Sequence, residues 1–169
     1  MYGTPEENID DLIWAYDLLL NTITDVTVSD EYQQEVNMYL LAGNHDRLMA
    51  NKDPNTERQG VYFLTRMLHE RFRHRDNINI IQGDPVTSIR YGDTVNVIAQ
   101  HGHLKKIKSS NMAQWRDLHG YDNVDRHLLL QGHVHRFDMH EFRTSPGYFL
   151  NVPCTVGKDS FQVDHLMKS

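Results

Sequence analysis

Leu128-Leu129-Leu130-Gln131-Gly132-His133-Val134-His135 is an apolar, strand-like run followed at once by a glycine and two histidines. The same order occurs twice upstream, where residues 38–41 precede Gly43-Asn44-His45-Asp46 and residues 95–99 precede His101-Gly102-His103. In open α/β sheets, ligands and catalytic groups collect in the crevice beyond the carboxyl ends of the strands. The three motifs therefore predict one metal site, built at a sheet edge from distant parts of the chain.

Length and composition predict a single domain over residues 1–169, long enough to bury a hydrophobic core. The 39% apolar content excludes a disordered polypeptide. A net charge of −6 gives no overall basic surface for nucleic acid, although two bound dications would offset most of it. The eleven histidines are roughly twice the number expected for this length, which metal binding or a tag would explain, and no histidine run is present.

Cysteine use and the absence of a targeting pattern indicate a reducing compartment. The single Cys154 cannot form an internal disulfide, and the sequence shows neither a cleavable apolar N-terminal run nor an 18-residue apolar span. We therefore expect a cytoplasmic protein that has no membrane partner.

Apolar periodicity predicts an α/β fold. A first amphipathic helix is expected over residues 4–24, with Pro5 at its first turn and one buried face. That face would consist of Ile9, Leu12, Ile13, Tyr16, Leu19, Leu20 and Ile23. Trp14 and Trp115 are expected in the core.

Further elements alternate along the chain. A second helix over residues 56–75 should bury Val61, Leu64, Leu68 and Phe72, and should expose an arginine cluster that is better interpreted as a solvated surface than as a phosphate patch. A short helix is expected over 111–118. Strands are expected over 36–41, 78–82, 95–100 and 128–131, with turns at 83–85 and 91–93 and a hairpin formed by 138–142 and 148–152.

His133 and His135 lie two residues apart on a turn, where Gly132 permits close approach of the backbone to a ligand. Imidazole nitrogen binds zinc, manganese, iron or nickel, and pairs of such metals about 3.5–4 Å apart cleave phosphate esters. The alternative is a turn with partly buried imidazoles, or, at Asn44, a turn stabilised by the amide side chain. The following histidines lack such a context and are expected to be ordinary: His69, His74, His119, His127, His140 and His165.

The three motifs resemble the later sequence blocks of the calcineurin-like metallophosphoesterase family, and they stand here in the family's order over roughly the last three quarters of the chain. The resemblance implies an αββα fold, in which a sandwich of sheets is flanked by helices. It also implies hydrolysis of a phosphate ester by a metal-activated water. The wording of residues 41–46 is closest to the DNA-repair-exonuclease-like branch, which favours a phosphodiester of nucleic acid or a nucleotide as substrate.

The same resemblance implies the metal ligands. Asn44, His101 and His133 would bind one ion and His135 the other. Two divalent ions, manganese or alternatively zinc, iron or nickel, would be present in the complete enzyme.

The catalytic roles also follow from the resemblance. His45 would face the substrate, stabilising charge on the phosphoryl oxygens or protonating the leaving alkoxide, and Asp46 would orient that imidazole. His103 is expected either behind the metal ligands or facing the substrate. Arg47 and Lys105 are candidates for contacting the substrate. A solvated surface is the alternative for the lysines.

Two family blocks, Asp-x-His and Gly-Asp, are missing before the first helix, and with them the carboxylate that bridges the metals. The pairs Gly83-Asp84 and Gly92-Asp93 follow the first motif and sit in expected turns, so they do not replace it. We therefore expect an N-terminally incomplete domain lacking its N-terminal strand or strands: a fragment, a late start, or half of a two-chain enzyme.

Four neutral donors, without the missing carboxylates, should bind one ion or none. A homo-oligomer or a second chain that supplies strands is a possible partner. The alternative function is a catalytically inactive scaffold that binds a protein partner. The missing carboxylates favour the scaffold, and the retained His45 favours the enzyme.

Overall fold

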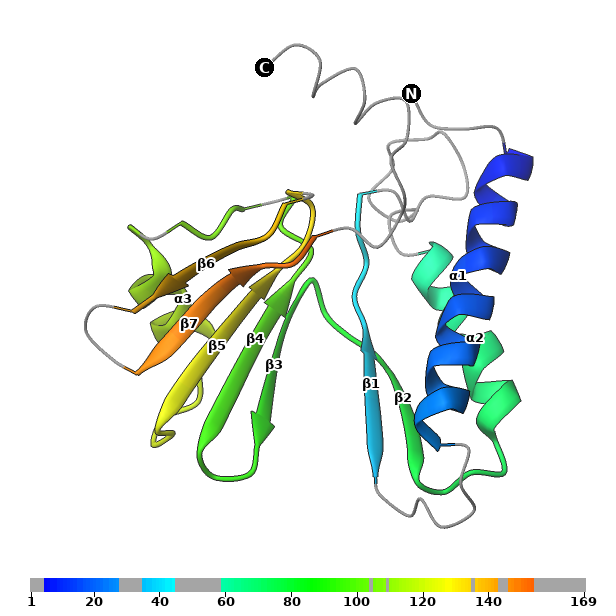
Figure 1. Ribbon diagram of the computed structural model, residues 1–169, viewed down its shortest axis with the longest axis horizontal. Coiled ribbons are helices and arrows are strands. Elements are labelled where there is room, and N and C mark those ends of the chain that lie inside the picture. Colours follow the sequence, from blue (N-terminus) through cyan, green and yellow to red (C-terminus); the bar gives the residue numbers. More distant parts are fainter. Residues whose placement is uncertain are drawn as a thin grey trace. The chain divides into compact units, whose positions relative to one another are not determined.

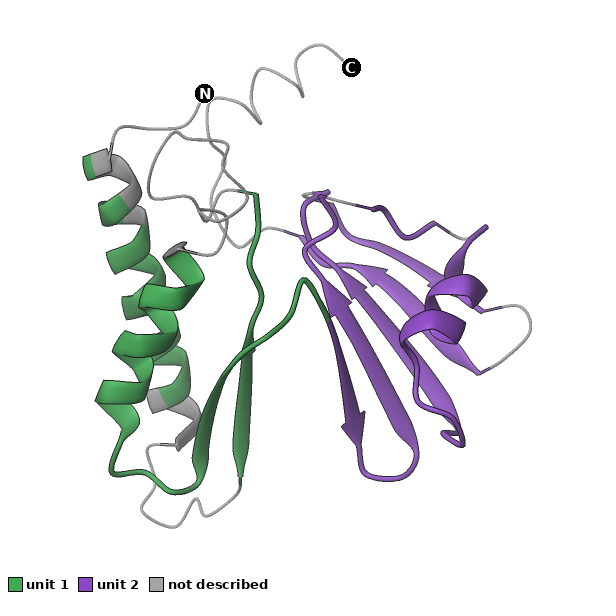
Figure 2. Ribbon diagram, turned by 180° about the vertical axis from the view of Figure 1, so that it is seen from behind, with its two compact units in different colours: residues 1–86 green, residues 87–169 purple. Residues whose placement is uncertain are grey.

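The computed structural model describes residues 5–27, 35–44, 59–103, 105–108, 110–134, 136–142 and 146–153. The chain divides into two compact units, residues 1–86 and 87–169 (Figure 2). Each unit combines parallel strands with helices, which confirms the α/β class (Figure 1). The finer αββα sandwich and the single domain over residues 1–169 stay predictions.

The first unit is a parallel strand pair with a helical crossover. It contains α1 (Pro5–Thr27), β1 (Val36–Leu40), α2 (Gln59–Phe72) and β2 (Ile78–Gln82). The strands β1 and β2 pair in parallel, with Val36 opposite Ile78, because α2 returns the chain to the same end of the sheet. Helix α2 contacts β2, and α1 contacts α2. The core consists of Ile23, Leu40, Val61, Leu64, Leu68, Ile78 and Ile80.

Helix α1 does not bury the whole of its expected face. Ile23 is 2% exposed, whereas Ile9 and Ile13 are 50% and 48% exposed, so the prediction was wrong for these two residues. Helix α1 has 23 residues and α2 has 14, and the first turns of α1 extend past the start of α2 (Figure 1). Trp14, at 49% exposure, was also wrongly predicted to be buried.

The two longer helices otherwise have the expected surfaces. Helix α2 buries Leu64 and Leu68, and the four arginines of residues 66–75 are exposed, as predicted. Arg73 pairs with Glu70 at 2.6 Å in an exposed ion pair, which contributes little stability in water. None of the helices in the described ranges has the length and apolar character needed to cross a membrane.

The second unit is a five-stranded sheet in the order β3-β4-β5-β7-β6. Its elements are β3 (Val86–Tyr91), β4 (Val95–Gln100), α3 (Met112–His119), β5 (Arg126–Gln131), β6 (Asp138–Glu141) and β7 (Gly147–Asn151). The strands β4, β5 and β7 are parallel, and β6 forms the expected antiparallel pair with β7.

Strand β3 is an addition to the predicted elements. Residues 86–91 lie between two turn signals and carry little of the apolar alternation that identifies a strand. Their side chains are half-buried or exposed, because none of them needs to enter a core. The turn at residues 91–93 is confirmed as the connection between β3 and β4, with Gly92 at φ 58°. Arg90 and Asp93 pair across it at 3.1 Å.

One face of the second sheet carries the core in a single row. Ile98, Leu129 and Phe149 occupy matching positions on β4, β5 and β7, and all three are fully buried. Met112 and Trp115 of α3 are also buried in this unit, as predicted for Trp115. The packing of this row sets how the three parallel strands are aligned along their length. It therefore also sets the positions of the loops at their carboxyl ends.

Candidate functional site

Two histidine-bearing loops leave neighbouring strands of the second unit at the same level. Gln100 of β4 is the register partner of Gln131 of β5, and both strands end there. The ring centroids of His101 and His133 are 5.1 Å apart, and those of His101 and His103 are 5.3 Å apart. The third pair, His103 and His133, is separated by 6.4 Å. Three predicted site residues are thus brought together at the carboxyl edge of parallel strands, as expected.

His103 has an unusual environment within this cluster. Both of its ring nitrogens are buried, and neither has a hydrogen-bond partner among the described residues. Burying a polar group without a partner costs folding free energy, and an unsatisfied buried group calls for an explanation such as an ion or a ligand. A neutral imidazole always presents one lone pair, which can be given to a cation.

The backbone of both loops adopts conformations that side chains disfavour. His133 has φ 66°, in the left-handed region, and Gly102 has φ 98°. The amide of Val134 donates to the carbonyl oxygen of Gly132 at 2.8 Å, which closes a tight turn around His133. Backbone strain of this kind costs about 1–3 kcal/mol and is concentrated at functional sites.

The other predicted site residues are distributed differently. Asn44 lies just after β1, in the first unit, and is half-buried. His45, Asp46, Arg47 and His135 lie outside the described residues, so their assigned roles stay predictions.

Lys105 is exposed on the loop after His103, and its Nζ lies 5.8 Å from the centre of the Trp115 ring. At this distance the ammonium group has a cation–π contact of modest strength. The contact places the Lys105 ammonium group near α3. That Lys105 contacts a substrate stays a prediction.

The chemistry of the imidazole cluster suits a borderline divalent ion, because imidazole is a ligand for zinc, manganese, iron and nickel. The buried, unpartnered nitrogens of His103 fit the same requirement. Within the described ranges, however, no group of three or more His, Cys, Asp or Glu side chains is arranged to hold a metal ion. The described residues therefore offer suitable donors without forming a complete metal centre.

A row of buried amides beneath the histidine loops was not anticipated from the sequence. Gln100, Gln131 and Asn151 are the last residues of β4, β5 and β7, and all three are buried. Each strand ends in Gln or Asn, which is the only local signal in the sequence. Recognising the row requires the strand register, which places the three amides side by side.

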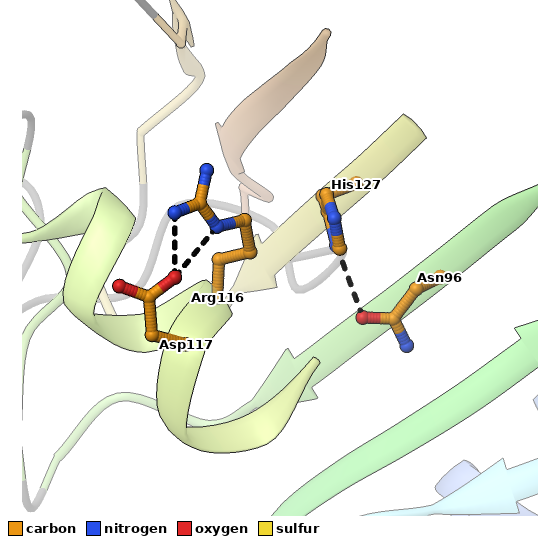
Figure 3. A network of polar contacts seen from close by, with 4 residues as sticks. All are labelled: Asn96, Arg116, Asp117 and His127. Carbon is orange, nitrogen blue, oxygen red and sulfur yellow. Dashed lines mark hydrogen bonds and ion pairs between the residues drawn. The ribbon is translucent and has the colours of Figure 1, made fainter. Parts of the chain in front are cut away.

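The opposite end of these strands carries a second polar cluster, shown in Figure 3. Asn96 donates to the hydroxyl of Ser88 at 2.8 Å, so its Oδ1 is left to accept from Nδ1–H of His127, 3.3 Å away. Burial, together with the Arg116 guanidinium, lowers the pKa of His127, and Asp117 opposes that shift. His127 is thus a half-buried, hydrogen-bonded histidine whose lowered pKa favours the neutral form, in agreement with its expected ordinary role.

In comparisons with known proteins, no family model, no curated protein and no solved structure matches this chain. The metallophosphoesterase resemblance therefore rests on the three quoted motifs.

Proposed function

We propose that this chain carries the nitrogen-rich half of a metal-dependent phosphoesterase site, which hydrolyses a phosphodiester of nucleic acid or a nucleotide. The observation that carries the proposal is the cluster of His101, His103 and His133 at the carboxyl ends of β4 and β5, in which His103 has two buried nitrogens without partners in the described part of the chain. A bound ion that accepts nitrogen lone pairs offsets the free-energy cost of burying these nitrogens, and it therefore explains the cluster.

In this proposal the chain's own residues bind the ion and move a proton. His101 and His133, together with Asn44 and His135, are the donors, and a bound divalent ion supplies charge stabilisation and a nucleophile at neutral pH. His45 protonates the leaving alkoxide, and Asp46 accepts its second N–H and holds the ring in position. The ion is manganese, with zinc, iron and nickel as alternatives.

The preference for a phosphodiester is supported by the charge close to the cluster. Lys105 and Lys106 are both exposed on the loop that follows His103. Cationic side chains beside a site attract the phosphates that flank a scissile bond in nucleic acid. The overall charge of −6 restricts this attraction to the local surface.

Equilibrium dialysis with Mn²⁺ and with Zn²⁺ tests the metal half of the proposal. We expect the unaltered chain to bind one ion, and His101→Ala and His133→Ala to weaken binding at least about tenfold. His74→Ala is the matched control, because His74 is an exposed histidine of the first unit. Equal binding by all variants, or none by the unaltered chain, contradicts the proposal.

Hydrolysis of a bis-aryl phosphodiester and of an aryl phosphomonoester with added Mn²⁺ tests the chemistry. Because the site lacks the family's carboxylates, we expect little turnover by this chain, with the diester as the better substrate. We expect His45→Ala to abolish that turnover while Mn²⁺ binding is retained. Turnover that survives His45→Ala would exclude the assigned proton donor.

A scaffold that binds a protein partner is the second candidate function. It is favoured by the exposed apolar side chains of α1, because Ile9, Ile13 and Trp14 are each about half exposed. Apolar residues exposed together on one element often mark protein interfaces. Metal binding without hydrolysis of either ester, in a chain that still folds, would favour this alternative.

A further inference from the structure

The amide row is connected directly to the loop that carries His101 and His103. Oε1 of Gln131 accepts two hydrogen bonds, one from Nε2 of Gln100 at 3.0 Å and one from the backbone amide of Ile107 at 2.6 Å. Nε2 of Gln131 donates to Oδ1 of Asn151 at 2.9 Å. Gln131 therefore joins three neighbouring strands, seen side by side in Figure 1, to the far end of the loop.

Gln100 holds the same loop at a second point. Its Nε2 donates to the carbonyl oxygen of Lys105 at 2.9 Å as well as to Gln131. The loop is thus fixed at Lys105 and Ile107, immediately after His103. The backbone adds a further link, since the amide of Gly132 donates to the carbonyl oxygen of Gln100 at 3.2 Å.

The start of the loop packs directly onto Gln131. A Cβ atom placed on Gly102 would lie 2.6 Å from Cγ of Gln131 and 2.9 Å from its Cδ. Real Cβ atoms do not approach other carbons so closely, so only glycine fits between the two histidines. Gln131 thus contacts the loop both at Gly102, between His101 and His103, and at Ile107.

These polar residues occupy places that apolar ones could fill. Two residues earlier on the same strands, Ile98, Leu129 and Phe149 form an apolar row that is at least as well buried. Buried hydrogen-bonded networks add less stability than apolar packing, but they fix one arrangement of the groups they join. Hydrogen-bonded amide side chains thus stand in place of apolar ones in the row that adjoins the histidine loops.

We propose that Gln131, with Gln100, is the positioning residue of the imidazole cluster: it sets where His101 and His103 lie relative to His133. The inference rests on the proposed function for its purpose, and on the described contacts for its geometry. Gln131 has no direct contact with substrate in this scheme. Its role resembles that of outer residues that orient metal-binding side chains, whose loss weakens metal affinity about 10–100-fold.

Gln131→Met tests the proposal, because methionine keeps the length of the side chain and cannot make the three amide hydrogen bonds. Leu129→Met is the matched control, since Leu129 is equally buried on the same strand, one row away from the loops. In the full chain we expect Gln131→Met to weaken Zn²⁺ binding about 10–100-fold and Leu129→Met to change it less than about threefold.

Histidine ring signals in the metal-free chain provide a readout that does not depend on metal binding. NMR spectra should show the signals of His101, His103 and His133 shifted or broadened in Gln131→Met, with those of His74 and His140 unchanged. Unchanged signals of the three clustered rings would overturn the positioning role, as would equal losses of affinity in the two methionine variants. If the unaltered chain binds no Zn²⁺ but its ring signals respond to Gln131→Met, the proposed function fails and the positioning role stands.

Discussion

Gly102→Ala should destabilise the second unit strongly. An alanine at φ 98° carries a backbone penalty of about 1–3 kcal/mol. Its Cβ would meet Cγ of Gln131 at 2.6 Å, and overpacking of this kind costs typically about 1–3 kcal/mol more. The two terms together predict a loss of about 2–6 kcal/mol in the free energy of unfolding, which is a large part of the stability of a small domain.

Gly92→Ala is the matched control for the steric part of this loss. Gly92 also has a left-handed backbone, with φ 58°, but no atom of the described residues lies within 4 Å of the Cβ position. Only the backbone penalty of about 1–2 kcal/mol should remain. Urea unfolding monitored by fluorescence of Trp115, which is buried in the same unit, measures both variants.

A double mutant separates the contact from general damage to the loop. Gln131→Ala removes the two carbons that an alanine at position 102 would meet, so the combined loss should be smaller than the sum of the single losses by about 1–3 kcal/mol. Strictly additive losses, or a Gly102→Ala variant as stable as Gly92→Ala, would refute the proposed packing of Gly102 on Gln131.

Two further predictions concern the interior of the chain. The pKa of His127 is lowered on folding, so its contribution to stability is complete above the unfolded-state pKa of about 6.5 and is lost as the pH falls through the folded-state pKa. The urea midpoint should therefore decrease as the pH is lowered from about 7.5 to about 5.5. It should decrease less steeply in the His127→Gln variant. Trp115→Ala should cost about 3–5 kcal/mol, because Trp115 is 4% exposed, whereas Trp14→Ala, at 49% exposure, should cost well under half as much in urea unfolding monitored by circular dichroism.

Much of the fold could be predicted from local periodicity, because the relevant signal lies within single elements. The spacing of Val61, Leu64 and Leu68 identifies the buried face of α2 without any tertiary information. Strand β3 was missed because a half-exposed edge strand needs no apolar alternation, and its place in the sheet depends on β4. The exposure of Ile9 and Ile13 also depends on a neighbour, since the shorter α2 does not reach them.

The candidate site shows the same division between local and long-range information. His101 and His133 could be predicted to meet, because each follows an apolar strand and parallel strands end together. The role of Gln131 could not be predicted, since a glutamine at a strand end is also typical of a solvent-exposed position. Only the register between β4, β5 and β7, set by residues 20 to 31 positions apart along the chain, places its amide between two others.

The two polar ends of the second sheet differ in how completely their groups are satisfied. At one end Asn96 bonds to both Ser88 and His127, which accounts for the buried amide and for the neutral imidazole. At the other end His133 has a left-handed backbone, and His103 has two buried nitrogens that find no partner within the described ranges. Stability alone selects against both features, and the satisfied end shows that this sheet can bury polar groups without them. Among the described residues, Nε1 of Trp115 is also buried without a partner, and Asn123 also has a left-handed backbone. The loops bearing the family-like motifs combine the two features, which supports a bound ligand there over a purely structural role for these histidines.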